Sequence, residues 1–151
     1  MKVPLVTISI PIYNCDNHLI DCLQSVVNQI YKNIEIQLVD DLGNDNSMQL
    51  AEDFVLKHPD FNFKILQNEK NSGLSVVRNV GINNAEGKYI FFLDSDDEIT
   101  PDCISNMVEI AEREQVEMVC GNVKTIRLES KEEIKAFRLQ NTKEKTTGNT
   151  E

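Results

Sequence analysis

Four acidic side chains directly follow a short apolar run near the middle of the chain. In the segment "GKYIFFLDSDDEITP", residues 87–101, they are Asp94, Asp96, Asp97 and Glu98. Side chains at positions i and i+2 of an extended segment point to the same side, so Asp94 and Asp96 face together. Two convergent carboxylates with no histidine or cysteine in the same run suit Mg²⁺ or Mn²⁺ better than zinc. The spacing therefore indicates a divalent-cation site, and the alternative interpretation is a solvated loop that begins a helix.

Polar residues also follow two earlier apolar runs. The first is "PIYN" at residues 11–14, and the second is "DDLGNDNS" at residues 40–47, which opens with Asp40 and Asp41. In an open parallel sheet, ligands bind beyond the carboxyl ends of the strands, where the strand order reverses. If the strands that end here are neighbours, these signals converge on one cleft with Asp94. A divalent cation there would relieve the repulsion among the carboxylates and would let the site accept an anionic ligand such as a diphosphate.

The elements that must position these residues alternate along the chain. Apolar and β-branched runs predict strands at residues 5–10, 34–39, 63–67, 89–93 and 116–123. Apolar residues at helical spacing predict helices at 19–27, 47–57 and 73–85, and a fourth that begins at Pro101 after an N-cap at Thr100. This order indicates an α/β fold with a mostly parallel, open sheet and helices on both faces.

The composition changes after residue 127. Residues 128–151 are polar and rich in Lys, Glu and Thr, with one weak helical pattern at Ile134 and Phe137. Such a segment cannot bury enough apolar surface to offset the entropy of ordering it. We expect one folded α/β domain at residues 1–127 and a partly helical or disordered tail at residues 128–151.

Charge and cysteine content exclude several classes of protein. The chain has 151 residues with a formal charge of −10, and its pI of about 4.7 argues against a nucleic-acid partner. No apolar run is long enough for a transmembrane segment, and the N-terminus does not resemble a secretory signal, so only peripheral membrane association is compatible with the sequence. The four cysteines form no C-x-x-C pair. Free thiols predict a cytoplasmic protein.

Four motifs occur in order over roughly residues 3–123: "TISIPIYN", "CLQSVVNQIYKNIEIQLVDD", "NSGLSVVRNVGINNAEGKYIFFLDSDD" and "TPD". Together they resemble the family 2 type glycosyltransferases, which have the GT-A fold of nucleotide-diphospho-sugar transferases. The resemblance implies that residues 1–127 bind a nucleotide-diphospho-sugar, in particular a UDP-sugar. It also implies inverting transfer of the sugar to an acceptor hydroxyl, most often in polysaccharide biosynthesis.

The same resemblance assigns roles at the nucleoside end of the site. Pro11 and Tyr13 would flank the nucleobase, and an aromatic ring at a strand end is a reasonable stacking platform. Asp41 would accept a hydrogen bond from the base, which favours uracil. Asp40 would belong to the same site, or would be structural and cap the following loop.

At the diphosphate end, the resemblance assigns the Asp-x-Asp element to Asp94, Ser95 and Asp96. Asp94 and Asp96 would hold Mg²⁺ or Mn²⁺, with Asp96 the more direct ligand. The cation would neutralise the leaving diphosphate as the sugar–oxygen bond breaks. Arg78 would reach the diphosphate or hold an aspartate of the cluster, and a plain surface ion pair is the alternative.

The chain departs from the family pattern at two places. Leu42 stands where a glycine often follows the acidic pair, and Gly43 is displaced by one position. The acceptor half, with the carboxylate that acts as general base, is not recognisable after residue 123, so we expect a chain truncated before that half. Enzymatic activity is therefore left open, and the alternative is a non-catalytic copy that binds a nucleotide-sugar or a partner without turnover.

Other classes of α/β protein fit the motifs poorly. In a phosphoacceptor receiver domain the acidic pair follows the first strand, whereas here the first strand is followed by "PIYN". Neither the dinucleotide-binding G-x-G-x-x-G pattern nor the P-loop pattern occurs.

Overall fold

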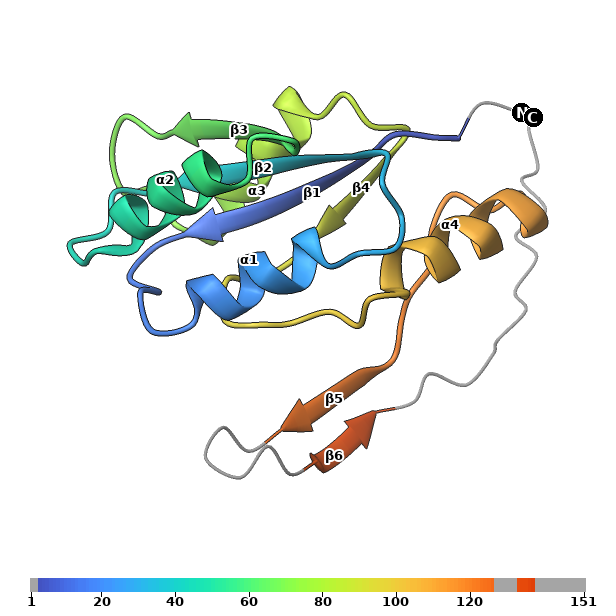
Figure 1. Ribbon diagram of the computed structural model, residues 1–151. Coiled ribbons are helices and arrows are strands. Elements are labelled where there is room, and N and C mark those ends of the chain that lie inside the picture. The colour runs from blue at the N-terminus through green and yellow to red at the C-terminus, as the bar shows by residue number, and fades with distance from the viewer. Residues whose placement is uncertain (1–2, 127–132, 138–151) are drawn as a thin grey trace, which may run out of the picture. The chain divides into compact units, whose positions relative to one another are not determined.

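The computed structural model describes residues 3–126 and 133–137 (Figure 1). The strands are β1 (Val6–Ile12), β2 (Ile34–Asp40), β3 (Asn62–Gln67), β4 (Tyr89–Phe92), β5 (Val123–Ile126) and β6 (Glu133–Phe137). The helices are α1 (Leu19–Val27), α2 (Ser47–Lys57), α3 (Leu74–Asn84) and α4 (Cys103–Glu114). The chain divides into two compact units, Met1–Val108 and Glu109–Glu151. Among the described helices, none has the length and apolar character needed to cross a membrane.

The first unit contains a parallel four-stranded sheet in the order β3-β2-β1-β4. Val6 of β1 is in register with Ile34 of β2 on one side and with Tyr89 of β4 on the other. The chain therefore builds outward from β1 through β2 to β3 and then crosses to the opposite side of β1. The strand order reverses between β1 and β4, which is where open α/β sheets bind ligands.

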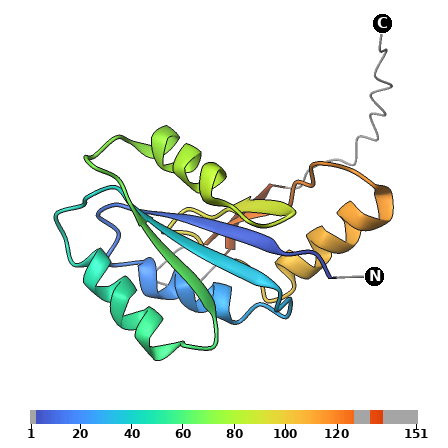
Figure 2. The same ribbon diagram turned by 90° about the horizontal axis from the view of Figure 1, so that it is seen from above.

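The two faces of this sheet are covered by different helices. Figure 2 shows α1 and α2 on one face and α3 on the other, which confirms the predicted α/β fold. Apolar side chains of the strands pack against α1 and α2 in one core, which includes Ile8, Ile10, Leu19, Leu23, Ile36, Leu38, Ala51 and Phe54. Alternation along β1 and β2 directs these residues to the same face.

The face under α3 is polar, and α3 approaches it closely. Thr7, Ser9 and Gln37 are buried on this face. A Cβ added to Gly81 would lie 2.3 Å from Ser9 Oγ and 3.2 Å from Ser9 Cβ, so a larger residue at position 81 would force the Ser9 side chain or the helix to shift. The glycine that interrupts the predicted helical pattern is thus inside α3, because this close contact outweighs its low helix propensity.

Three sequence predictions for the later part of the chain are wrong. Helix α4 begins at Cys103 rather than at Pro101. Residues 116–122 are not a strand. The strand starts at Val123 as β5 and pairs antiparallel with β6 instead of joining the parallel sheet. The weak helical pattern at Ile134 and Phe137 lies in β6, because two apolar residues do not distinguish a helix from a strand and the pairing decides.

The remaining prediction for the tail, disorder near the end of the chain, concerns residues 138–151, which lie outside the described residues. The predicted domain boundary between residues 127 and 128 stays a prediction.

Candidate functional site

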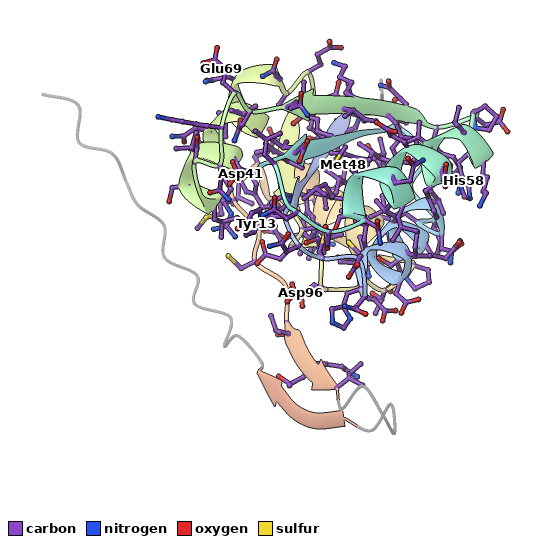
Figure 3. All side chains as sticks on the ribbon, turned by 90° about the vertical axis from the view of Figure 1, so that its left-hand side faces the viewer. Tyr13, Asp41, Met48, His58, Glu69 and Asp96 are labelled. Atoms are coloured by element: carbon purple, nitrogen blue, oxygen red, sulfur yellow. The ribbon has the colours of Figure 1, made fainter. Side chains whose placement is uncertain are left out.

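The ends of β1, β2 and β4 border one cleft of about 370 Å³. Its lining residues are Pro11, Tyr13, Asp41, Asn71, Gly73, Leu74, Val77, Asp94, Ser95 and Asp96. Figure 3 looks at the edge toward which β1 points in Figure 1, with Tyr13, Asp41 and Asp96 labelled there and His58 at the right-hand edge of the view. The structure thus brings together polar residues that follow three separate strands.

Six of the residues proposed from the sequence line this cleft, and two do not. Pro11, Tyr13, Asp41, Asp94, Ser95 and Asp96 are among the lining residues. Asp40 is buried behind them, where its Oδ1 accepts a hydrogen bond from Leu42 N at 2.8 Å and its Oδ2 accepts one from Gln67 Nε2 at 2.8 Å. Asp40 therefore closes the turn after β2 and ties it to β3.

Arg78, the second residue outside the lining, holds one of the aspartates. Its Nη2 donates to Asp94 Oδ1 at 3.0 Å, and its guanidinium lies over the Phe92 ring, 5.9 Å from the ring centre. Arg78 Nε is buried and has no hydrogen-bond acceptor among the described residues. Leaving a buried donor without an acceptor costs free energy, so Arg78 is held at Asp94 partly at the expense of this group.

At the other end of the cleft, Tyr13 is 46% exposed and available for stacking. The backbone around it is fixed to the loop after β2. Asn14 Oδ1 accepts a hydrogen bond from Asn44 N at 2.8 Å, and Cys15 N donates to Ser47 Oγ at 2.8 Å. These contacts set the position of the Tyr13 segment against the loop that carries Asp41.

The close contact of these two loops explains where the chain needs glycine. A Cβ on Gly43 would lie 2.8 Å from Asn14 N, so the loops meet only because Gly43 has no side chain. Leu42 has a φ of +58°, in the left-handed region that favours glycine. The displaced glycine of the sequence motif therefore retains a contact role, while Leu42 adopts a backbone conformation that is unfavourable for leucine.

The Asp41 carboxylate is 3% exposed and organises the loop before α3. Its Oδ1 accepts hydrogen bonds from Asn68 Nδ2 at 2.7 Å and Ser72 N at 2.9 Å, and its Oδ2 accepts one from Gly73 N at 2.8 Å. Burial by itself would raise the pKa of Asp41, but these hydrogen bonds outweigh it and hold the pKa below its usual range.

Sequence reasoning did not assign roles to the segment that Asp41 organises. Asn71, Gly73, Leu74 and Val77 line the cleft. Gly73 has a φ of +82° and directly precedes α3. A glycine at the start of a predicted helix, following Asn71 and Ser72, was the available signal for a tight turn at the site.

The acidic loop, residues 94–98, concentrates negative charge at the other end of the cleft. Burial raises the pKa of Asp97, and the neighbouring Asp96 and Asp94 raise it further. Among the described residues, no three His, Cys, Asp or Glu side chains are grouped as a complete metal site. Asp94 and Asp96 supply two carboxylates, which fits a hard cation such as Mg²⁺ that takes its other ligands from water and from substrate phosphates.

Comparison with protein families identifies a match over most of the chain. A sequence model of glycosyl transferase family 2 matches residues 7–150. Glycosyltransferase GlyA of Streptococcus pneumoniae is 38% identical over 118 residues, which are 78% of this chain and 16% of GlyA. Glycosyltransferase GlyG of the same organism is 34% identical over 118 residues, which are 78% of this chain and 38% of GlyG.

The fold is also similar to solved structures. The crystal structure of S. aureus TarS 1–349 in complex with UDP-GlcNAc matches with a TM-score of 0.68 and 29% identity, over 74% of this chain and 32% of that chain. The chain therefore spans well under half the length of each of these relatives. The match confirms a fold of the GT-A type for the region that carries the cleft.

Proposed function

The chain belongs to glycosyl transferase family 2, and from this premise we propose that its cleft binds a UDP-sugar together with Mg²⁺ or Mn²⁺ for inverting transfer to an acceptor hydroxyl. One observation carries the proposal. Tyr13, Asp41, Asp94 and Asp96, which follow three different strands, line a single cleft at the point where the strand order reverses.

The nucleoside end suits uracil. Tyr13 offers an exposed ring for stacking. A carboxylate has about four acceptor positions, and Asp41 uses three of them on Asn68, Ser72 and Gly73. The remaining position on Oδ2 can accept the imide N–H of uracil. The crystallised TarS binds UDP-GlcNAc, which supports a uridine nucleotide as the ligand here.

The opposite end suits a diphosphate with a cation. Asp94 and Asp96 would hold the cation, which when bound supplies Lewis-acid stabilisation of the leaving diphosphate. Arg78 keeps Asp94 in place and adds a positive charge beside it.

Donor binding and sugar transfer are separate claims. The chain spans 16% of GlyA and 38% of GlyG, so the activity of a whole enzyme does not follow from its family. The general base for the acceptor hydroxyl is not assigned to any residue of this chain. The second proposal is therefore that the chain binds the nucleotide-sugar or a partner without turnover. An acceptor substrate and a role in polysaccharide biosynthesis belong only to the first proposal, sugar transfer.

Calorimetric titration of the full chain with UDP and UDP-sugars, with and without Mn²⁺ or Mg²⁺, tests donor binding. We expect binding that is strengthened by the cation and that Asp96→Asn weakens about tenfold or more, because one ligand of the cation is lost. Asp53→Asn, which alters an exposed carboxylate on α2, is the matched control. Absence of any UDP binding in the presence of either cation would refute the proposal.

Turnover is measured separately, as release of UDP from a UDP-sugar by the purified chain. Release that disappears in Asp96→Asn supports transferase chemistry and eliminates the second proposal. Binding without release supports the second proposal. The expected cytoplasmic location, with Cys15, Cys22, Cys103 and Cys120 as free thiols, belongs to the same hypothesis.

A further inference from the structure

A cysteine and two polar side chains along α1 and just after it are buried where a core-facing helix normally carries apolar residues. They are Cys22, Ser25 and Gln29, spaced at i, i+3 and i+7, and here they are called the α1 polar row. Ser25 is 8% exposed and Gln29, just after the helix, is 1% exposed. Buried polar groups are costly unless they have partners, so each of them must satisfy a specific group.

The Gln29 side chain has one partner in its own helix, Ser25 O at 3.1 Å, and two where the chain passes from β4 into α4. Gln29 Nε2 donates to Thr100 O at 2.8 Å, and its Oε1 accepts from Ile104 N at 3.1 Å. Both ends of one side-chain amide therefore hold the backbone on the two sides of the start of α4. A second contact in the same place joins Ile30 N to Pro101 O at 2.8 Å.

The other two members of the row hold the same segment nearer to the cleft. Ser25 Oγ accepts from Ile99 N at 3.2 Å and donates to Cys22 O at 2.7 Å. Cys22 Sγ donates to Asp94 O at 3.7 Å. The α1 polar row thus contacts the backbone of this segment from the first residue of the acidic loop to the first turn of α4.

We propose that the α1 polar row is a positioning device for the acidic loop, which keeps Asp94 and Asp96 on the same cleft wall in the absence of a cation. The inference rests on the proposed function, since it names the residues that prepare the cation end of that site. None of the three side chains lines the cleft, so they act through the backbone of the loop and not on a ligand.

The loop needs such support for an electrostatic reason. Asp94, Asp96 and Asp97 place three carboxylates within four positions, and like charges at this spacing favour conformations that separate them. The segment between β4 and α4 is irregular, and its backbone contacts are few: Leu93 N donates to Ser9 O of β1, and Asp97 N donates to Asp94 O within the loop. Hydrogen bonds from a rigid helix oppose the separation and hold the geometry that a cation requires.

Hydrogen–deuterium exchange of the full chain tests the contacts themselves. Gln29→Met keeps the size of the side chain and removes all three of its hydrogen bonds, and Ser25→Ala removes the acceptor for Ile99 N. We expect the amides of Ile104 and Ile99, respectively, to exchange about tenfold faster or more, the factor that corresponds to loss of a buried hydrogen bond. Val26→Ala, a buried truncation on the same helix, is the control and should leave both amides protected.

Titration of the same variants tests what the contacts do for the site. We expect the gain in UDP affinity that Mn²⁺ provides to fall about tenfold in Gln29→Met and Ser25→Ala, with less than a twofold change in the affinity for uridine, which lacks the diphosphate. A general loss of stability would instead lower both affinities and would do so in Val26→Ala as well.

The outcomes separate this inference from the function on which it rests. A wild-type chain that binds no UDP with Mn²⁺ refutes the proposed function. The positioning role alone is refuted if the wild-type chain binds UDP with Mn²⁺ and the variants keep the full gain in affinity from Mn²⁺. It is likewise refuted if the variants keep the Ile99 and Ile104 amides protected from exchange.

Discussion

Asp41 and the acidic loop border the same cleft, but their surroundings shift carboxylate pKa values in opposite directions. Asp41 is buried and accepts three hydrogen bonds from residues 68–73, which lower its pKa. In the acidic loop, burial and two neighbouring aspartates raise the pKa of Asp97. The proposed nucleoside end is therefore completed by folding itself, whereas the proposed diphosphate end keeps an excess of negative charge that a bound cation would reduce.

The two kinds of carboxylate contribute differently to the stability of the free protein. A carboxylate whose hydrogen bonds are intramolecular stabilises the fold before any ligand arrives. A carboxylate that is crowded by like charges destabilises the fold slightly, and this repulsion is relieved only when a cation binds. Substitutions at the two ends should therefore separate stability from ligand binding.

Asp41→Ala should have the largest effect on folding. The substitution leaves Ser72 N and Gly73 N without their acceptor, and loss of hydrogen bonds to a buried charge costs about 2–3 kcal/mol. Urea denaturation with linear extrapolation measures the change in the free energy of unfolding. Asp53→Ala, at an exposed carboxylate, should change it by less than about 0.5 kcal/mol. Equal stability of the two variants would show that Asp41 is not a structural anchor.

Acid should remove the same contribution from the wild-type protein. Because the pKa of Asp41 is lower in the folded state than in the unfolded state, its contribution is present at neutral pH and is lost as pH falls below about 4. The stability difference between wild type and Asp41→Ala should therefore shrink at low pH. Denaturation curves of both proteins over a pH series measure this, and a constant difference would contradict it.

Asp96→Asn should have a smaller effect of the opposite sign on folding. Removing one charge from the acidic loop reduces its repulsion with Asp94 and Asp97, so the free energy of unfolding should stay constant or rise by up to about 1 kcal/mol. The same variant should lose the strengthening of UDP binding by Mn²⁺. If Asp96→Asn instead unfolds as readily as Asp41→Ala, the two ends do not differ as described.

Leu42→Gly should give the smallest change, at the proposed nucleoside end. Leu42 has a φ of +58°, and glycine adopts this conformation without the steric cost that leucine meets. After allowance for the greater freedom of glycine in the unfolded chain, we expect a gain of about 0.5 kcal/mol. Thermal denaturation measures it, and Leu56→Gly on helix α2 should lose about 1 kcal/mol as the control. A loss in Leu42→Gly would mean that the leucine side chain stabilises the loop.

Local sequence patterns determined most of the first unit and much of its cleft. Runs of β-branched residues and helical spacing predicted the alternation from β1 to β4, because these periodicities arise from the backbone geometry of each element alone. The polar residues after β1, β2 and β4 were recognised for the same reason, and Tyr13, Asp41 and Asp96 line one cleft as predicted. The pattern failed at residues 116–122 and 134–137, because neither an apolar run nor two apolar residues alone fix secondary structure and the pairing of β5 with β6 decides where the strands lie.

Only the tertiary structure decided which polar atoms pair and what each residue therefore does. Asp41 accepts a hydrogen bond from Asn68, 27 positions away in the sequence, and Cys22 donates one to Asp94 O, 72 positions away. No local period encodes such partners, because they depend on the order of strands in the sheet and on how closely α1 and α3 approach it. The sequence determined which chemical groups stand at the strand ends, and the fold decided which of them are satisfied and which still lack a counter-charge.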